Sequence, residues 1–249
     1  MSGCLRHAHL GSSPWTTSSS CPRLRASVAA DMTELAPRAT ARIRPHDPEE
    51  PAPAGPALRV VHESGDIDLA AAEAAAGQFL NALGISTSSE SLRGTPGRMA
   101  RAYAELFSPR PFDLTTFPND EGYDELVLAR RIPVRSVCEH HLLPFVGTAH
   151  VGYLPGGRIL GLSKLARVVE HFACRPQVQE RLTKQVADWL QTHLEPKGVG
   201  VVIEAEHSCM TLRGVQATGS STMTSTLLGL LRSDARSRAE FLALTGATS

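Results

Sequence analysis

The strongest constraint on how this chain can fold is the uneven distribution of core-building residues along it. Residues 1–57 hold 8 of the 17 prolines in the 249-residue sequence but only one of its 12 aromatic residues, Trp15. Such a segment buries too little apolar surface to offset the conformational entropy that ordering removes. We therefore predict a disordered tail over residues 1–65 and a single folded domain over residues 66–249.

The composition of this tail leaves three interpretations open. Its first 30 residues are rich in Ser, Thr and Arg and contain no acidic residue, as in an organelle transit peptide. The tail lacks the apolar stretch of about 7–15 residues that marks a secretory signal. A transit segment over residues 1–31, a plain disordered tail and a true start at Met32 are the alternatives. We expect a cytoplasmic protein.

The composition of the whole chain argues against several classes of protein. The 25 Lys and Arg residues balance the 25 Asp and Glu residues, so no broad basic surface for nucleic acid is expected. No run approaches the roughly 18 consecutive apolar residues of a membrane span. Five scattered cysteines, an odd number, do not suggest the framework of a secreted disulfide-rich protein. The thiols are then available for metal binding or chemistry.

The hydrophobic pattern after residue 65 predicts an α+β fold. Helical spacing ends at Gly84, and a second helix is predicted with Thr95 as its N-cap and Pro96 at its first position. Two later helices are predicted to begin at Ser163 and at Pro176. Strand patterns cover residues 125–137, 145–154, 158–162 and 198–214. This order of elements predicts a mostly antiparallel sheet with the helices segregated from it.

Three short segments hold most of the reactive side chains. The first is Cys138-Glu139-His140-His141. A cysteine and a histidine three residues apart can reach one metal ion from a turn, and thiolate plus imidazole is a zinc-type ligand set. The spacing is weak evidence by itself, because a C-x-x-H pattern also arises by chance.

The second segment is His207-Ser208-Cys209, within the strand predicted over residues 198–214. Side chains alternate along a strand, so one face is predicted to carry His207, Cys209, Thr211 and Arg213.

A metal site drawn from these two segments would use Cys138, His141 and Cys209. Three protein ligands leave one open position, which is the coordination of catalytic zinc; structural zinc sites usually have four. Two alternatives remain open. The site could be structural and closed by His140 or His207, or Cys209 could be a buried core thiol.

The third segment is residues 161–167, at a predicted helix start. Ser163 is predicted as the N-cap, and free backbone N–H groups at a helix start favour an anion. Lys164 and Arg167, three residues apart, lie on the same side of the first turn. The segment therefore predicts a phosphate site; the alternative is a solvated basic pair.

Gln179 and Glu180 are predicted in the first turn of the next helix, off its apolar stripe of Val178 and Leu182. One interpretation is that Glu180 complements the helix dipole. The other is that its carboxylate accepts hydrogen bonds from the N–H edge of a guanine-type ring.

Over residues 66–245 the chain closely resembles the zinc-dependent GTP cyclohydrolase I family. The matching segments fall in the right order and are TPGRMA, SVCEHHLLPFVGTAHVGYLP, ILGLSKLARVVEHFA, RPQVQERLT, GVGVVIEAEHSCMTLRGV and STMTS. The combination of CEHH, GLSKLAR, QVQER and EHSCMTLRG is highly specific. No motif position departs from the family pattern in a way that puts catalysis in doubt.

The resemblance implies a tunnelling fold, in which antiparallel sheets backed by helices join side by side into a barrel. It implies a homo-oligomer, a decamer of two pentamers, with active sites at subunit interfaces. The reaction it implies is hydrolytic opening of the guanine imidazole ring of GTP with release of formate. The ribose then rearranges and the ring recloses as 7,8-dihydroneopterin triphosphate, in the first step of pterin and folate biosynthesis.

The resemblance also implies a function for individual residues. The zinc ligands would be Cys138, His141 and Cys209. The proton donors and acceptors would be His140 and His207, whose side chains titrate near neutral pH. The guanine edge would be held by Glu180 with Gln179 beside it. The ribose and the triphosphate would be held by Ser163, Lys164, Arg167, Arg213 and Arg98.

Two other kinds of function compete with this one. The first is a relative on the same fold that acts on another pterin or a deazaguanine. A nitrile-reducing relative of this kind would need a nucleophilic cysteine and a nicotinamide site. A structural zinc module or a degenerate regulatory subunit would not need His140 and His207. The complete CEHH and HSC set, together with the cations suited to a triphosphate, favours the GTP-opening enzyme.

Overall fold

The computed structural model describes residues 42–43, 58–60 and 65–246. Most of the predicted tail lies outside these residues, and so do the proposed transit segment and Met32. Within the tail, β1 (Arg42–Ile43) pairs with β2 (Leu58–Val60), which pairs in turn with β3 (Phe112–Leu114). For the rest of residues 1–65, the disordered tail stays a prediction.

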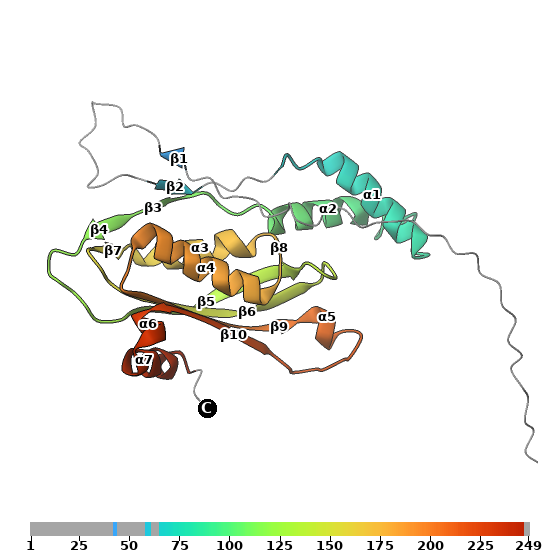
Figure 1. Cartoon of the computed structure of the whole chain (residues 1–249). Coiled ribbons are helices and arrows are strands. Elements are labelled where there is room, and N and C mark those ends of the chain that lie inside the picture. The colour runs from blue at the N-terminus through green and yellow to red at the C-terminus, as the bar shows by residue number, and fades with distance from the viewer. Residues whose placement is uncertain (1–41, 44–57, 61–64, 247–249) are drawn as a thin grey trace, which may run out of the picture. The chain divides into compact units, whose positions relative to one another are not determined.

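A five-stranded sheet is the centre of the described structure (Figure 1). Its order is β10–β9–β6–β5–β8, and its long antiparallel strands are β5 (Val127–Cys138), β6 (Pro144–Leu154), β9 (Gly198–His207) and β10 (Thr222–Gly229). The short β8 (Pro176–Gln177) runs parallel to the end of β5. The predicted α+β class and the mostly antiparallel sheet are therefore confirmed.

Helices α3 (Leu162–Ala173) and α4 (Gln179–Leu194) cover one face of this sheet (Figure 1). In α3 the apolar residues recur at intervals of three and four, which turns one side of a helix inward. Leu165, Val168, Val169 and Phe172 are accordingly buried, and they belong to the main core together with the inward side chains of β5, β6 and β9.

The opposite face of the sheet carries α6 (Leu230–Ser233) and α7 (Ala235–Thr245) (Figure 1). Phe241 of α7 is fully buried in a smaller core with Leu154, Val202 and Leu231. A Cβ atom at Gly200 of β9 would lie 2.7 Å from the Phe241 ring, so a glycine is needed for α7 to approach the sheet this closely.

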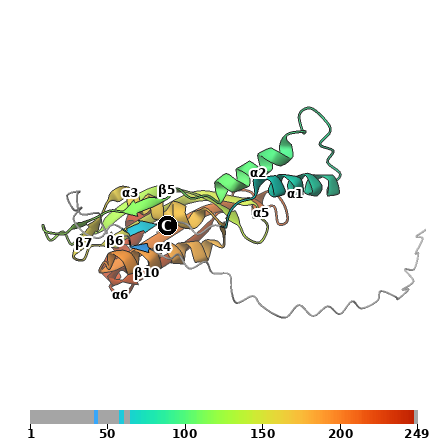
Figure 2. The ribbon, with the colours of Figure 1, turned by 90° about the horizontal axis from the view of Figure 1, so that it is seen from above.

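Helices α1 (Leu69–Ala82) and α2 (Thr95–Leu106) lie side by side (Figure 2). Asp68 caps α1 by accepting a hydrogen bond of 2.9 Å from the backbone N–H of Ala71, and Gly84 follows the helix with a φ of +76°. A positive φ suits glycine, which confirms the predicted stop. The remaining strands, β4 (Thr116–Pro118) and β7 (Arg158–Leu160), form a separate pair.

Two predicted N-caps are wrong. The N-cap of α2 is Gly94; Thr95 is already helical, and Pro96 follows it inside the first turn. The N-cap of α3 is Gly161, and Ser163 lies one residue inside the helix. Neither cap uses a side-chain hydrogen bond, so the preference for Ser or Thr at this position gave no valid signal here.

The predicted helix start at Pro176 is also wrong, because Pro176 lies in β8 and pairs with Val137 of β5. The fixed φ of proline suits an extended segment as well as a helix start. Helix α4 begins later, at Gln179.

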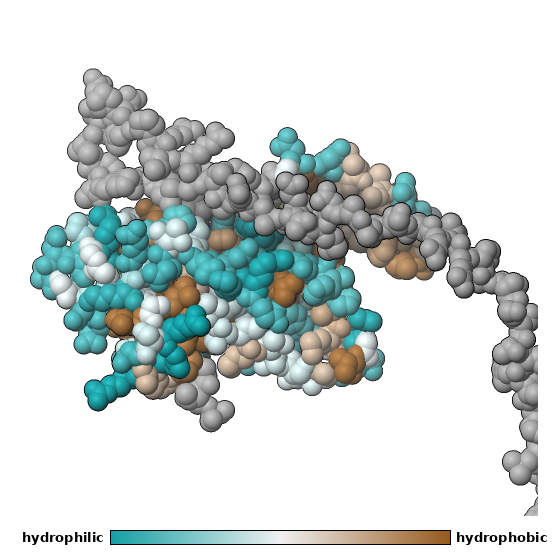
Figure 3. All heavy atoms as spheres, viewed as in Figure 1, coloured by the Kyte–Doolittle hydropathy of each residue, from teal (hydrophilic) through white to brown (hydrophobic). Residues whose placement is uncertain are grey.

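Within the part of the chain that the structure describes, no helix is both long and apolar enough to cross a membrane. The surface visible in Figure 3 is mainly hydrophilic, with hydrophobic residues in small separate groups.

Candidate metal centre

The turn between β5 and β6 brings Cys138 and His141 together. The Cys138 carbonyl accepts hydrogen bonds from the backbone N–H groups of His141 (3.4 Å) and Leu142 (2.8 Å), and the Cys138 N–H donates to the Leu143 carbonyl (2.9 Å). Leu142 takes a left-handed φ of +51° to close the turn. In this tight turn the Cys138 Sγ lies 3.8 Å from the His141 Nδ1.

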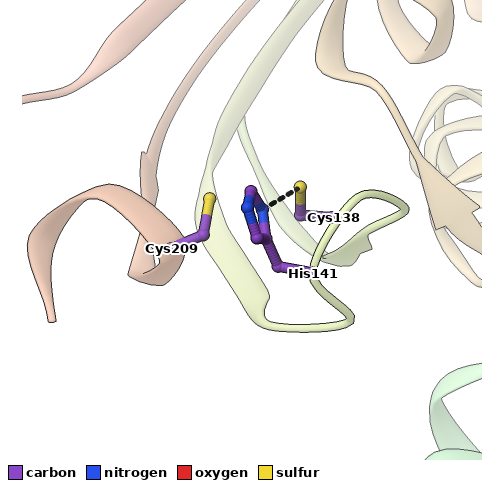
Figure 4. A group of neighbouring side chains, drawn as sticks. All are labelled: Cys138, His141 and Cys209. Carbon is purple, nitrogen blue, oxygen red and sulfur yellow. Dashed lines mark hydrogen bonds between the residues drawn. The ribbon is translucent and has the colours of Figure 1, made fainter. Parts of the chain in front are cut away.

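Cys209 reaches this turn from a different element. The predicted strand over residues 198–214 is wrong beyond His207, because β9 ends there and a short helix, α5 (Ser208–Thr211), follows. The expected alternation that placed Cys209 and Arg213 on one strand face therefore does not hold. The side chains of Cys138, His141 and Cys209 nevertheless point toward one another (Figure 4), and their ligand atoms all lie within 4.8 Å.

The geometry of this cluster fits a metal ion. Tetrahedral bonds of about 2.3 Å to sulfur and about 2.0 Å to nitrogen separate the two ligand atoms by about 3.5 Å. The measured Cys138–His141 separation of 3.8 Å is close to this value. The cluster found among the described residues includes neither His140 nor His207, so it favours three protein ligands over the closed four-ligand alternative.

The cluster borders a cavity of about 240 Å³. Besides the three ligands, the lining includes His140, His207 and Glu180, together with Gln177, Val178, Gln179, Met210 and Thr222. The expected proton-transferring histidines and the expected guanine-binding carboxylate therefore share one cavity with the metal cluster.

The ring of His207 is held on two sides. It stacks on Phe145, with ring centroids 4.5 Å apart and planes at 11°, and its Nε2 lies 2.8 Å from the Gln179 Oε1. Burial lowers the pKa of His207 below its ordinary value, although the charge of Glu180 opposes the shift. His207 is therefore predominantly neutral at neutral pH.

Burial favours the neutral form of the neighbouring Cys209 thiol as well. Burial, with a smaller contribution from the neighbouring Cys138, raises the pKa of the Cys209 thiol. A bound cation would reverse this effect, because a coordinated thiol is deprotonated.

Gln179 is oriented differently from the sequence expectation. It does not lie off the apolar stripe: it is only 2% exposed, and its amide nitrogen faces the backbone oxygens of Ile203 (3.1 Å) and Thr222 (2.8 Å). The Gln179 carboxamide is therefore already hydrogen bonded within the protein. Glu180, the next residue, is exposed and lines the cavity.

The residues expected to hold ribose and triphosphate do not line this cavity. They are Ser163, Lys164 and Arg167 in the first turns of α3, Arg98 in α2 and Arg213 after α5. Arg98 donates to the Ser91 carbonyl and the Thr95 hydroxyl. One chain therefore brings together the metal ligands, the two histidines and Glu180, but not the expected triphosphate cations.

Arg167 has a partner on its own helix. Its guanidinium contacts the Glu170 carboxylate at 3.1 Å, and Arg110 contacts the same carboxylate at 2.7 Å. Burial would raise the pKa of Glu170, but the hydrogen bonds and charges of Arg110 and Arg167 outweigh burial and lower the pKa. Glu170 therefore stays ionised and restrains Arg167.

Several residues of the site were not identified from the sequence. Phe145 stacks on His207. The Tyr103 hydroxyl donates to the Leu142 carbonyl (2.9 Å) in the turn between β5 and β6. Arg181 forms an ion pair with Glu139 in the same turn. Each of these three contacts joins residues that are far apart in the sequence, so no local pattern predicts it. Only the proximity of Arg181 to Glu180 in the QVQER segment could have drawn attention to one of them.

Fold and site together define an α+β protein in which two cysteines and one histidine at the end of the sheet form a cluster that could hold a metal ion. The family model described as GTP cyclohydrolase I matches residues 72–246. The chain belongs to the GTP cyclohydrolase I family.

Curated relatives agree with this assignment over most of the chain. GTP cyclohydrolase 1 of Mycobacteroides abscessus is 53% identical over 189 residues, which cover 74% of this chain and 93% of the relative. The Streptomyces avermitilis protein of the same name is 54% identical, covering 72% and 92%. The Aquifex aeolicus one is 52% identical, covering 67% and 90%.

A solved structure of an apo archaeosine synthase QueF-Like protein aligns more weakly. It has a TM-score of 0.35 and 18% sequence identity, and the alignment covers 42% of this chain and 93% of that chain. The family assignment does not depend on it.

Proposed function

We propose that this protein hydrolytically opens the imidazole ring of GTP, releases formate and forms 7,8-dihydroneopterin triphosphate. The observation that carries the proposal is one cavity lined by the Cys138–His141–Cys209 cluster, two further histidines and Glu180. It occurs in a chain whose residues 72–246 match the family model.

The metal proposed for the cluster is zinc. Two thiolates and one imidazole are typical zinc ligands, and three protein ligands leave a position open for catalysis. When bound, zinc supplies Lewis-acid activation of water near neutral pH.

The residues around the cluster bind the guanine and move protons. The exposed carboxylate of Glu180 is proposed to accept hydrogen bonds from the N–H edge of the guanine. Gln179 was expected to share this contact, but its buried carboxamide is already hydrogen bonded, so the contact is assigned to Glu180. His140 and His207, which both line the cavity, donate and accept the protons that ring opening requires.

The triphosphate is proposed to bind residues of a second copy of the chain. Ser163 would contact the ribose, and the anionic end would be held by Lys164, Arg167, Arg213 and Arg98. The first turn of α3 has no side-chain cap, so its N–H groups are suited to an anion. Because these residues do not line the cavity of their own chain, the proposal includes a homo-oligomer, a decamer of two pentamers, with shared sites.

The experiment that tests this function is a GTP assay combined with metal analysis. Purified zinc-loaded protein should release formate from GTP and produce a pterin that fluoresces after oxidation. GDP and guanosine serve as controls for the triphosphate. Intact GTP after incubation with fully zinc-loaded protein would contradict the proposed function.

A further inference from the structure

The environment of Gln179 determines which nitrogen of His207 carries a proton. Gln179 begins α4 and His207 ends β9, so their contact joins the helix to the sheet beside the metal cluster. At this contact, the hydrogen bonds that surround Gln179 can each be given a direction from chemistry alone.

The first step is the orientation of the carboxamide. Its nitrogen lies 3.1 Å from the Ile203 carbonyl oxygen and 2.8 Å from the Thr222 carbonyl oxygen. A backbone carbonyl can only accept a hydrogen bond, so the NH₂ group must face these two oxygens. A flipped carboxamide would place oxygen against oxygen at both contacts. The other carboxamide atom, Oε1, therefore faces His207.

Two threonine hydroxyls support the same orientation of the Gln179 carboxamide. Thr183 donates its single hydroxyl proton to the Gln179 backbone carbonyl (2.8 Å). Thr224, whose Oγ1 lies 2.6 Å from the Thr183 Oγ1, must then be the donor in that pair. Its remaining contact, 3.1 Å from the Gln179 nitrogen, is one in which Thr224 accepts. The hydroxyls therefore also require an NH₂ group at this position.

The orientation of the Gln179 carboxamide fixes the position of the proton on the His207 imidazole. The Gln179 Oε1 is an acceptor and lies 2.8 Å from the His207 Nε2, so in the neutral ring Nε2 must carry the proton. A flipped ring would place a C–H group at this contact and lose the hydrogen bond. Stacking on Phe145 also fixes the plane of the ring.

We propose that Gln179 is a positioning residue that holds His207 in its Nε2–H tautomer and leaves Nδ1 as the ring nitrogen that accepts a proton. Gln179 and Thr183 are only 2% and 1% exposed, so water does not readily replace these contacts. No hydrogen bond to Nδ1 occurs among the described residues. The catalytic consequence rests on the proposed function, whereas the tautomer does not.

The tautomer can be measured directly in the zinc-loaded protein. Protein labelled with ¹⁵N-histidine is studied by nitrogen NMR, and the His207 signals are assigned by their absence from the His207→Asn spectrum. The expected spectrum has a protonated Nε2 and an unprotonated Nδ1. A protonated Nδ1 with a bare Nε2 would overturn the proposal. Because this measurement uses the unmodified chain, it is decisive even if no Gln179 variant folds.

Kinetics of three variants test the positioning function. Gln179→Leu removes the acceptor, so the His207 tautomers should mix and kcat should fall about ten- to a hundredfold, as for other residues that orient a site, with little change in KM for GTP. Gln179→Glu keeps an acceptor toward Nε2 and should retain the tautomer, but its second carboxylate oxygen faces the Ile203 and Thr222 carbonyls, so its Tm should be lower than that of the wild type. Gln191→Leu, on the same helix and bonded to the Pro196 carbonyl, is the matched control and should resemble the wild type.

Other outcomes would overturn the assignment. A Gln179→Leu enzyme with unchanged kcat and tautomer would show that Gln179 does not position His207. A raised KM with kcat retained would place Gln179 in contact with GTP instead. If the wild type shows the Nε2–H tautomer but leaves GTP intact, the proposed function fails and the tautomer assignment stands.

Discussion

The end of the sheet that carries the metal cluster and the start of α3 differ in how much of the proposed active site each forms within one chain. At the metal end, residues from a turn, a short helix and a strand end converge on one cavity. At the start of α3, Lys164 and Arg167 face no part of that cavity, and Arg167 is held by Glu170. The difference supports the proposal that one chain supplies the metal ligands and the proton-transferring histidines, whereas a second copy supplies the residues that bind the triphosphate.

Loss of a metal ligand should have the largest effect. Cys209→Ser is expected to lose zinc and to lower turnover by about a thousandfold or more, because a bound metal contributes several kcal/mol and each 1.4 kcal/mol is a factor of ten. Zinc content and formate release measure the two effects. Full activity with retained zinc would remove Cys209 from the ligand set.

Loss of a histidine outside the cluster should separate chemistry from metal binding. His140→Ala is expected to keep zinc and to lower kcat by about a hundred- to ten-thousandfold, the usual contribution of acid–base catalysis. His141→Ala is the matched variant and should lose the metal. If His140→Ala lost zinc instead, the assignments of the two adjacent histidines would be reversed.

Changes at the start of α3 should affect the substrate and leave the metal in place. Arg167→Ala is expected to raise KM for GTP about ten- to a hundredfold, because a hydrogen bond to a charged group contributes about 1.5–3 kcal/mol. Zinc content should equal that of the wild type. An unchanged KM would assign Arg167 to the ion pair with Glu170 alone.

The smallest effect concerns the Glu170 carboxylate. Its pKa is lowered in the folded protein, so its ion pairs stabilise the fold above the ordinary carboxyl pKa, and this stabilisation is lost as the pH falls through the folded-state value. Glu170→Gln should lower Tm by less than about 3 °C at pH 7, because these ion pairs are partly exposed and solvent screens them. The difference should vanish in acid. A difference that persists there would mean that packing is responsible.

The sequence supported the metal site better than the hydrogen bonds behind it. Cys138 and His141 lie three residues apart, so their proximity was readable from spacing, and the helix stripe of Leu165, Val168 and Phe172 was equally local. Cys209 was assigned correctly to the cluster but on the wrong element, because periodicity does not reveal that β9 ends at His207. The orientation of Gln179 depends on carbonyls of β9 and the start of β10, which no local pattern contains.

The shared site can be tested most directly by combining two defective variants in one oligomer. Cys209→Ser lacks the metal half, and a Lys164→Ala, Arg167→Ala double variant lacks part of the triphosphate half. If each site combines halves from two copies, co-expression of the two chains should restore about a quarter of the sites in randomly mixed oligomers. Turnover at low GTP should then rise well above that of either variant alone. Turnover no higher than the parents, in oligomers shown to contain both chains, would contradict a site shared between subunits.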